Sequence, residues 1–191
     1  KKLELAILPI EPQVANENLR EMDYCVRFAN ANRQLMMTRM LEALRQVLGD
    51  FDHGEIINKS HNFAAWEAHY GETVLVHRKG ATRAFTDELG MIPGSQGTHS
   101  YIVRGLANPE SFHSCSHGAG RKLGRKQARR ELDLQTEIDL LNERGVIHSI
   151  RHVKDLDEAT SAYKDINVVM ENQKDLAEIV VELSPLAVLK G

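Results

Sequence analysis

The sequence is short of cysteine, of net charge and of long apolar runs. Its only cysteines, Cys25 and Cys115, give no disulfide framework and suit a reducing cytoplasm. A formal net charge of −3 argues against wholesale coating of a nucleic acid, so any such contact must use a local basic patch. No apolar run reaches transmembrane length, and no signal-peptide pattern opens the chain. We therefore expect a cytoplasmic protein without membrane contact.

Two common nucleotide-binding patterns are also missing. No Gly-Lys-Ser/Thr follows the glycines of the 92–100 loop at the Walker spacing. No Rossmann fingerprint occurs either. The pattern of a lysine nucleophile is absent as well, which argues against a ligase of the usual lysine-adenylating kind. These absences disfavour a conventional nucleotide-binding fold.

The bulk composition is that of a globular protein. Its 191 residues, 42% hydrophobic and 27% charged, are enough for one domain or for the larger part of a bigger one. Apolar residues at helical spacing predict a long amphipathic helix over 16–48. Cys25 is interpreted as a core residue of that helix. The expected buried stripe consists of Met22, Cys25 or Val26, Ala29, Met36, Met40, Leu44 and Val47.

Shorter elements are expected in the remainder of the chain. Apolar and β-branched runs predict strands at 73–77, 81–85, 100–104 and 146–150. A basic helix is expected from Arg121 to about Asn142, and a helix over 166–176 is expected to be capped by Asp165. Strand-like runs lie at 3–8 and 188–191, and because the chain enters directly on the first of them at Lys1, we expect a fragment. The predicted fold class is mixed α/β (α+β).

The most informative stretch is Ser114-Cys115-Ser116-His117-Gly118-Ala119-Gly120-Arg121, followed by six Lys or Arg residues in the ten positions 121–130. Gly118 and Gly120 allow a sharp turn and a close approach to a ligand. A helix N-terminus just after them would favour an anion. A histidine beside a phosphate cradle is a candidate nucleophile toward phosphorus, because neutral imidazole can form a phosphoramidate. The competing interpretation is a turn before a solvated basic helix whose Arg121, Arg125 and Arg129 share one face.

Two further clusters are candidates for binding. His113, Cys115 and His117 alternate along the chain, and in an extended segment they could hold a zinc ion. The loop 92–100 offers glycine amides at 94 and 97 and hydroxyls at Ser95, Thr98 and Ser100, which suits a phosphate or nucleotide. Many surface turns have the same composition, so the second signal is weak by itself.

Several motifs, in order along the whole chain, resemble one family, the RtcB-type RNA-splicing ligases. The matching elements are Ser60-His61-Asn62-Phe63-Ala64, His77-Arg78-Lys79-Gly80-Ala81-Thr82-Arg83, Ile92-Pro93-Gly94-Ser95-Gln96-Gly97, Ser116-His117-Gly118-Ala119-Gly120-Arg121, Ala162-Tyr163-Lys164-Asp165-Ile166 and Leu189-Lys190-Gly191. The resemblance implies that residues 1–191 are the C-terminal portion of a single RtcB-like catalytic domain. Such ligases use GTP and manganese to join an RNA 2′,3′-cyclic phosphate or 3′-phosphate end to a 5′-hydroxyl end. Family members act on tRNA halves or other cleaved RNA, sometimes with an archease activator.

The resemblance also assigns roles to individual residues. It implies that His117 attacks the α-phosphate of GTP and becomes guanylylated, that His61 ligates a manganese ion, and that Asn62 contacts the GMP phosphate. The implied nucleotide pocket is lined by Pro93, Gly94, Ser95, Gln96, Ser100, Gly118, Ala119 and Gly120. Tyr163 is implied to stack on guanine, and Lys190 to hydrogen-bond its edge. The basic segment 121–130 is expected to contact the RNA backbone, unless its residues pair with nearby acids.

The resemblance places the family's other metal ligands before this chain. Its bridging cysteine and aspartate, two more metal histidines and the acidic residue that reads guanine should all precede Lys1. A lone histidine cannot hold a hydrated divalent ion tightly. Two alternatives to a ligase therefore stay open: a non-catalytic RNA- or phosphate-binding module without a complete metal site, and a zinc protein using His113, Cys115 and His117.

Overall fold

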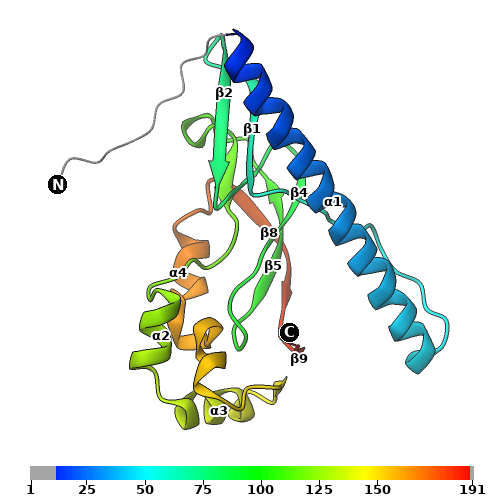
Figure 1. Cartoon of the computed structure of the whole chain (residues 1–191), viewed down its shortest axis with the longest axis vertical. Helices are drawn as coiled ribbons and strands as arrows, with labels where there is room; N and C mark the ends of the chain where they lie inside the picture. The colour runs from blue at the N-terminus through cyan, green and yellow to red at the C-terminus, as the bar shows by residue number, and fades with distance from the viewer. Residues whose placement is uncertain (1–11, 190–191) are drawn as a thin grey trace. The chain divides into compact units, whose positions relative to one another are not determined.

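The computed structural model describes residues 12–189, and its backbone contacts divide into two compact units, 1–79 and 80–191. Each unit is described by itself. Helices and small, mostly antiparallel sheets make up both, which confirms the mixed α/β class (Figure 1). Within the described range, no helix has the length and apolarity needed to cross a bilayer. The single catalytic domain stays a prediction, and the strand-like run at 3–8 lies outside the described residues.

The first unit is a long helix, α1 (Pro12–Leu48), beside a two-stranded hairpin (Figure 1). Proline suits the first helical position, where its missing N–H would have no intrahelical partner. The helix ends at Gly49, whose φ of 79° is left-handed and whose N–H donates to the Arg45 carbonyl at 2.9 Å. The predicted helix over 16–48 is therefore confirmed, with its start four residues earlier.

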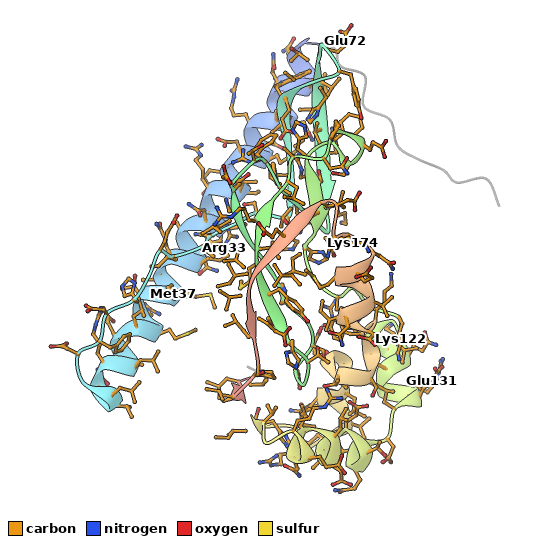
Figure 2. The ribbon with its side chains drawn as sticks, turned by 180° about the vertical axis from the view of Figure 1, so that it is seen from behind. Arg33, Met37, Glu72, Lys122, Glu131 and Lys174 are labelled. Carbon is orange, nitrogen blue, oxygen red and sulfur yellow. The ribbon has the colours of Figure 1, made fainter. Side chains whose placement is uncertain are left out.

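Most of the predicted buried stripe of α1 is wrong. Cys25 is exposed, and so are Met36, Met40, Leu44 and Val47, at 57%, 55%, 41% and 82%. The less exposed side chains instead run through Ala15, Leu19, Met22, Val26, Ala29, Arg33, Met37 and Leu41. Sequence reasoning skipped Arg33 because it is charged, and so lost the phase of the helix. The Arg33 guanidinium lies toward the segment that follows α1, where its Nε donates a hydrogen bond to Asn58 Oδ1 at 2.6 Å (Figure 2).

The hairpin pairs β1 (Asn62–His69) with β2 (Glu72–Lys79) in antiparallel register around the turn Tyr70-Gly71. Both turn residues have positive φ, at 53° and 81°, which matches the twist of the strands. Glu67 and Arg78 form a buried bidentate ion pair, with Arg78 Nη1 2.6 Å and Nη2 2.9 Å from the two carboxylate oxygens. Burial alone would raise the pKa of Glu67, but its hydrogen bonds to Arg78 and His69 and their charges hold that pKa below its usual value.

The second unit is built around a three-stranded antiparallel sheet, in the order β4-β5-β8 (Figure 1). Its elements are β3 (Ala81–Arg83), β4 (Leu89–Ile92), β5 (Ser100–Gly105), the 3-10 helix η1 (Pro109–Ser111), β6 (Ser114–Ser116), α2 (Arg125–Glu131), α3 (Leu134–Glu143), β7 (Ile147–His148), the 3-10 helices η2 (Val153–Glu158) and η3 (Thr160–Ala162), α4 (Ile166–Glu171), β8 (Ala177–Leu183) and β9 (Ala187–Val188). The main core includes Ile92, Tyr101, Val103, Ile166 and Met170.

The predicted basic helix from Arg121 to Asn142 is wrong as one element. The chain is extended at Leu132, and Asp133 caps a new helix by accepting a hydrogen bond from the Thr136 N–H at 2.8 Å. The first of the two helices begins only at Arg125, so Arg121 lies outside it and no helix N-terminus directly follows Gly120.

Of the remaining predicted elements, the strands at 73–77 and 100–104 are confirmed and extend a little further, as β2 and β5, whereas the others are shorter than predicted. Asp165 caps α4, as predicted, by accepting from the Asn167 N–H at 2.9 Å, although that helix already ends at Glu171. The strand expected at 81–85 ends at Arg83, and the one expected at 146–150 is reduced to β7. The C-terminal run contributes β9, which pairs with β7 in parallel. Short elements of this kind depend on tertiary pairing more than on propensity.

Candidate functional site

The imidazole of His117 is held by a backbone carbonyl. His117 directly follows β6, whose Ser116 pairs with Ala81 of β3, so Gly80 comes next to the ring. His117 Nδ1 lies 2.6 Å from the Gly80 oxygen. A carbonyl oxygen can only accept, so Nδ1 carries the proton and the lone pair of the neutral ring is on Nε2. The φ of Gly80 is 70°, and a Cβ there would lie 3.3 Å from His117 Cε1.

The backbone on both sides of His117 is also fixed. The Ser116 hydroxyl donates to the Gly118 carbonyl at 2.5 Å, and the Gly118 N–H approaches the same hydroxyl at 3.3 Å. The Ser116 N–H donates to Oε1 of Gln173 at 2.9 Å, and Gln173 is only 4% exposed. Sequence reasoning missed Gln173, because nothing in its surroundings along the chain marks it. Sequence reasoning recognised Gly80 as a turn residue and as part of a motif, without its contact to His117.

The loop between β4 and β5 lies against the glycine turn of His117. The Ala119 N–H donates to the Pro93 carbonyl at 3.0 Å, and a Cβ on Gly118 would lie 3.0 Å from that same oxygen. A Cβ on Gly94 would lie 2.1 Å from the His99 carbonyl, so only glycine fits there. The structure thus brings the predicted residues Pro93 and Gly94 together with Gly118 and Ala119.

The polar groups of this loop are largely used within it. The Ser95 N–H donates to Oγ1 of Thr98 at 2.6 Å, and the hydroxyls of these two residues are 2.8 Å apart. The Gly94 N–H lies 3.3 Å from Oγ of Ser100. Oε1 of Gln96 is buried with no hydrogen-bond partner within residues 12–189. The amide of Gly94 and these hydroxyls thus stabilise the turn itself, and their contact with a phosphate stays a prediction.

The arginines of the basic segment are largely neutralised by η2. Arg121 Nη1 and Arg125 Nε each lie 2.9 Å from the Glu158 carboxylate, and Arg129 Nη2 lies 2.7 Å from Oδ2 of Asp157. Burial alone would raise the pKa of Glu158, but its hydrogen bonds to Tyr163 and Arg125 and the two arginine charges lower it. The expected alternative, pairing with acids, is therefore found: three of the arginines pair with η2, and Arg130 Nη2 lies 2.9 Å from Oε1 of Glu131.

Tyr163 lies at the edge of a cavity of about 590 Å³. Its hydroxyl donates to Glu158, and the Arg121 guanidinium lies over its ring at 5.0 Å from the centroid. Burial, together with the Glu158 carboxylate, raises the pKa of this phenol above its usual value. Lys122, Arg144, Lys164 and Asp165 also line the cavity. One ring face is thus covered by an arginine.

The remaining predicted site residues belong either to the first unit or to the part of the chain outside the described residues. His61 and Asn62 lie in the first unit, both exposed, where Asn62 opens β1 opposite Lys79. Lys190 lies outside the described residues. Among residues 12–189, no three His, Cys, Asp or Glu side chains converge as metal ligands. The described donors by themselves therefore do not fit a manganese ion.

The alternative zinc site is wrong. Cys115 is 4% exposed, and its Sγ lies 3.3 Å from Oγ1 of Thr82 in the core. His113 packs edge-on against the ring of Phe85, with 5.2 Å between centroids. His117 is held by Gly80. The φ of His113 is 49°, so the segment is not extended there and the three side chains do not share one side.

Known proteins match this chain along its length. A family model described as tRNA-splicing ligase RtcB matches residues 1–191. RNA-splicing ligase RtcB of Escherichia coli is 38% identical over 185 residues, which cover 92% of this chain and 44% of that protein. The tRNA-splicing ligase RtcB of Pyrobaculum aerophilum is 34% identical over 215 residues, covering 98% of this chain and 44% of that protein. RNA-splicing ligase RtcB homolog 1 of Entamoeba dispar is 34% identical over 214 residues, covering 98% and 40%. The chain spans less than half the length of these curated relatives.

Proposed function

This chain belongs to the RtcB family of tRNA-splicing ligases, and we propose that it contributes the nucleophile of a GTP- and manganese-dependent RNA ligase. The substrates are an RNA 2′,3′-cyclic phosphate or 3′-phosphate end and a 5′-hydroxyl end, from tRNA halves or other cleaved RNA. The names of the relatives support ligation and RNA as the substrate. The two cysteines without a disulfide framework are the reason to propose a cytoplasmic location.

The observation that carries this proposal is the hydrogen bond between His117 Nδ1 and the Gly80 carbonyl. It selects the tautomer with the lone pair on Nε2, the form that attacks an electrophile. In the proposed step, Nε2 forms a bond to the α-phosphorus of GTP while the bond to the β-phosphate oxygen breaks, and pyrophosphate leaves with that electron pair. The product is a phosphoramidate between GMP and His117.

Two transfers complete the proposed reaction on a 3′-phosphate end. A 2′,3′-cyclic phosphate must first react with water at phosphorus, which breaks the bond to the 2′ oxygen and releases it as the 2′-hydroxyl. An oxygen of the RNA 3′-phosphate attacks the phosphorus of the GMP–histidine adduct, and the imidazole leaves with the lone pair restored on Nε2. The 5′-hydroxyl of the second RNA end then attacks the 3′-phosphorus, GMP leaves, and the hydroxyl proton passes to solvent. The Gly80 hydrogen bond keeps the ring oriented through all three steps, because the tautomer is the same before attack and after release.

The pocket proposed for the nucleotide is built from the two loops that meet at Pro93 and Ala119. The 3.0 Å hydrogen bond between them supports a shared surface beside His117. Gly118 and Gly120 keep Cβ atoms away from that surface, and the φ of Gly120 is 71°. Tyr163 is proposed to stack on guanine through the ring face that Arg121 does not cover. The roles of Asn62, Ser95, Gln96, Ser100 and Lys190 rest on the family resemblance.

Manganese is proposed as the cofactor, with His61 as one of its ligands. The metal supplies charge neutralisation to the phosphates when it is bound. Because the described residues do not form a complete donor set, we propose that the other ligands come from outside residues 1–191. A non-catalytic RNA- or phosphate-binding module is the second candidate function. The incomplete set of metal donors among the described residues favours it.

Intact mass spectrometry of the full-length protein tests the proposal. Incubation with GTP and manganese is expected to add one GMP to the wild-type chain and none to His117→Asn. His113→Asn is the matched control, because it removes from the same segment an imidazole that packs on Phe85 and has no proposed role in the reaction. An adduct that survives His117→Asn refutes the nucleophile assignment. Wild-type protein that binds RNA but never gains GMP supports the binding module.

A further inference from the structure

Some cationic side chains of the second unit form ion pairs with carboxylates of the described residues, and others do not. Arg121, Arg125 and Arg129 are each paired with a carboxylate of η2. Lys122, Arg144 and Lys164 line the 590 Å³ cavity, and none of the three has an ion pair within residues 12–189. Three cations without an ion pair in that range therefore gather at the cavity, whereas Lys126 is the one such cation among the residues of α2.

The wall of this cavity holds one acidic residue against three cations. That residue is Asp165, and its Oδ1 accepts the N–H of Asn167 at the start of α4. Arg144 is fixed in place, because its Nη1 donates to the Gly97 carbonyl at 2.6 Å. His99 is also on the wall, and its Nδ1 lies 2.5 Å from Oε1 of the exposed Glu182. The formal charge of the wall, counting His99 as neutral, is positive, and the cavity is large enough for a phosphate group with its sugar.

Backbone hydrogen bonds place both lysines beside the glycine turn of His117. The Lys122 N–H donates to the Ala162 carbonyl at 2.9 Å, and the Lys164 N–H donates to the Gly120 carbonyl at 3.0 Å. A Cβ on Gly120 would lie 4.0 Å from Cδ of Lys164. Figure 2 shows Lys122 on the segment that leads into α2. The cavity is thus contiguous with the loop that carries the nucleophile.

We propose that this cavity binds a backbone phosphate of the RNA 3′ end, through Lys122, Lys164 and Arg144. The inference rests on the proposed ligase function. Of the residues assigned to the nucleotide, only Tyr163 lines the cavity, whereas Pro93 to Gln96 and His117 to Gly120 do not. The nucleotide phosphate bonded to His117 therefore lies outside it, and the second phosphate-bearing substrate of the reaction is RNA. A positively charged groove that follows the backbone is a usual means of binding single strands.

Salt-dependent RNA binding by the full-length protein tests the cavity. The probe is a fluorescent single-stranded RNA with a 3′-phosphate, and the variants are Lys122→Gln, Lys164→Gln and the double variant. Each phosphate contact contributes roughly 0.7 to the slope of log Kd against log salt for single strands. The double variant is expected to bind about tenfold more weakly at low salt, with a slope lower by roughly 1.4. Lys154→Gln removes the same charge from an exposed site on η2 outside the cavity, and is expected to match wild type.

The possible results separate the cavity from the ligase proposal. Unchanged affinity and slope in the double variant overturn the cavity proposal. Normal RNA binding with slower GMP adduct formation also overturns it, because the lysines then serve nucleotide phosphates. Lysine-dependent RNA binding in a protein that never gains GMP supports the cavity and refutes the ligase. All three lysines are exposed, so equal melting temperatures are expected and serve as the folding control.

Discussion

Replacing Gly80 by alanine tests whether the hydrogen bond to His117 matters for chemistry. The substitution has two separable consequences. A non-glycine residue at a φ of 70° costs about 1–2 kcal/mol of stability. The added Cβ also meets His117 Cε1 at 3.3 Å and Nδ1 at 3.5 Å, so the ring must move by a few tenths of an ångström and the 2.6 Å hydrogen bond must lengthen. Misplacement of a nucleophile on this scale is expected to slow GMP adduct formation about tenfold, or ~1.4 kcal/mol.

Gly145→Ala supplies the matched control. Gly145 lies in the same unit with a φ of 68°, and a Cβ there meets nothing within 4 Å. Both variants are expected to lose similar stability, about 2–4 °C of melting temperature for each kcal/mol. Only Gly80→Ala is expected to lose the rate of adduct formation, measured by timed intact mass spectrometry at saturating GTP. Equal rates in the two variants, at equal loss of stability, refute the argument that the Gly80 contact orients the nucleophile.

Three further outcomes follow from contacts in the structure. Gln173→Met removes the acceptor of the Ser116 N–H, so timed mass spectrometry is expected to show about tenfold slower GMP adduct formation. Gln173→Glu keeps an acceptor oxygen and is expected to retain most of the wild-type rate. Equal rates for the two variants contradict a positioning role of Gln173. Glu67→Gln breaks the buried pair with Arg78 and is expected to cost about 3–5 kcal/mol at pH 7 in urea unfolding. The pKa of Glu67 is lower in the folded than in the unfolded protein, so its carboxylate stabilises the fold above pH 4.5, the usual pKa, and this stabilisation is lost as the pH falls through the folded pKa. The difference in unfolding free energy between wild type and Glu67→Gln must therefore become smaller in acid. A thiol reagent is expected to modify Cys25 quickly in the native protein and Cys115 only after unfolding, and the reverse order contradicts the assigned exposures.

The candidate site was predictable where motif and local geometry coincide. The glycines beside His117 and Pro93 were marked by the sequence, and the structure shows why glycine is needed at 94, where a Cβ would meet the His99 carbonyl at 2.1 Å. The three arginines were read as one helical face, yet Arg121 precedes the helix and each of them pairs with a carboxylate about 30 residues later in the chain. Helical spacing records neighbours three or four residues apart, and it carries no information about partners that distant.

By itself, the sequence determined the mixed α/β class, the long first helix, the Asp165 cap and membership of the RtcB family, because these depend on local periodicity, capping and motif order. Tertiary structure alone decided which face of α1 is covered, where the basic segment breaks and which cations keep their charge uncompensated. It also decided which nitrogen of His117 carries the proton, since the Gly80 carbonyl lies 37 residues away in the chain and reaches the ring only through the pairing of β3 with β6. Long-range pairing fixes these features, and local propensity does not record it.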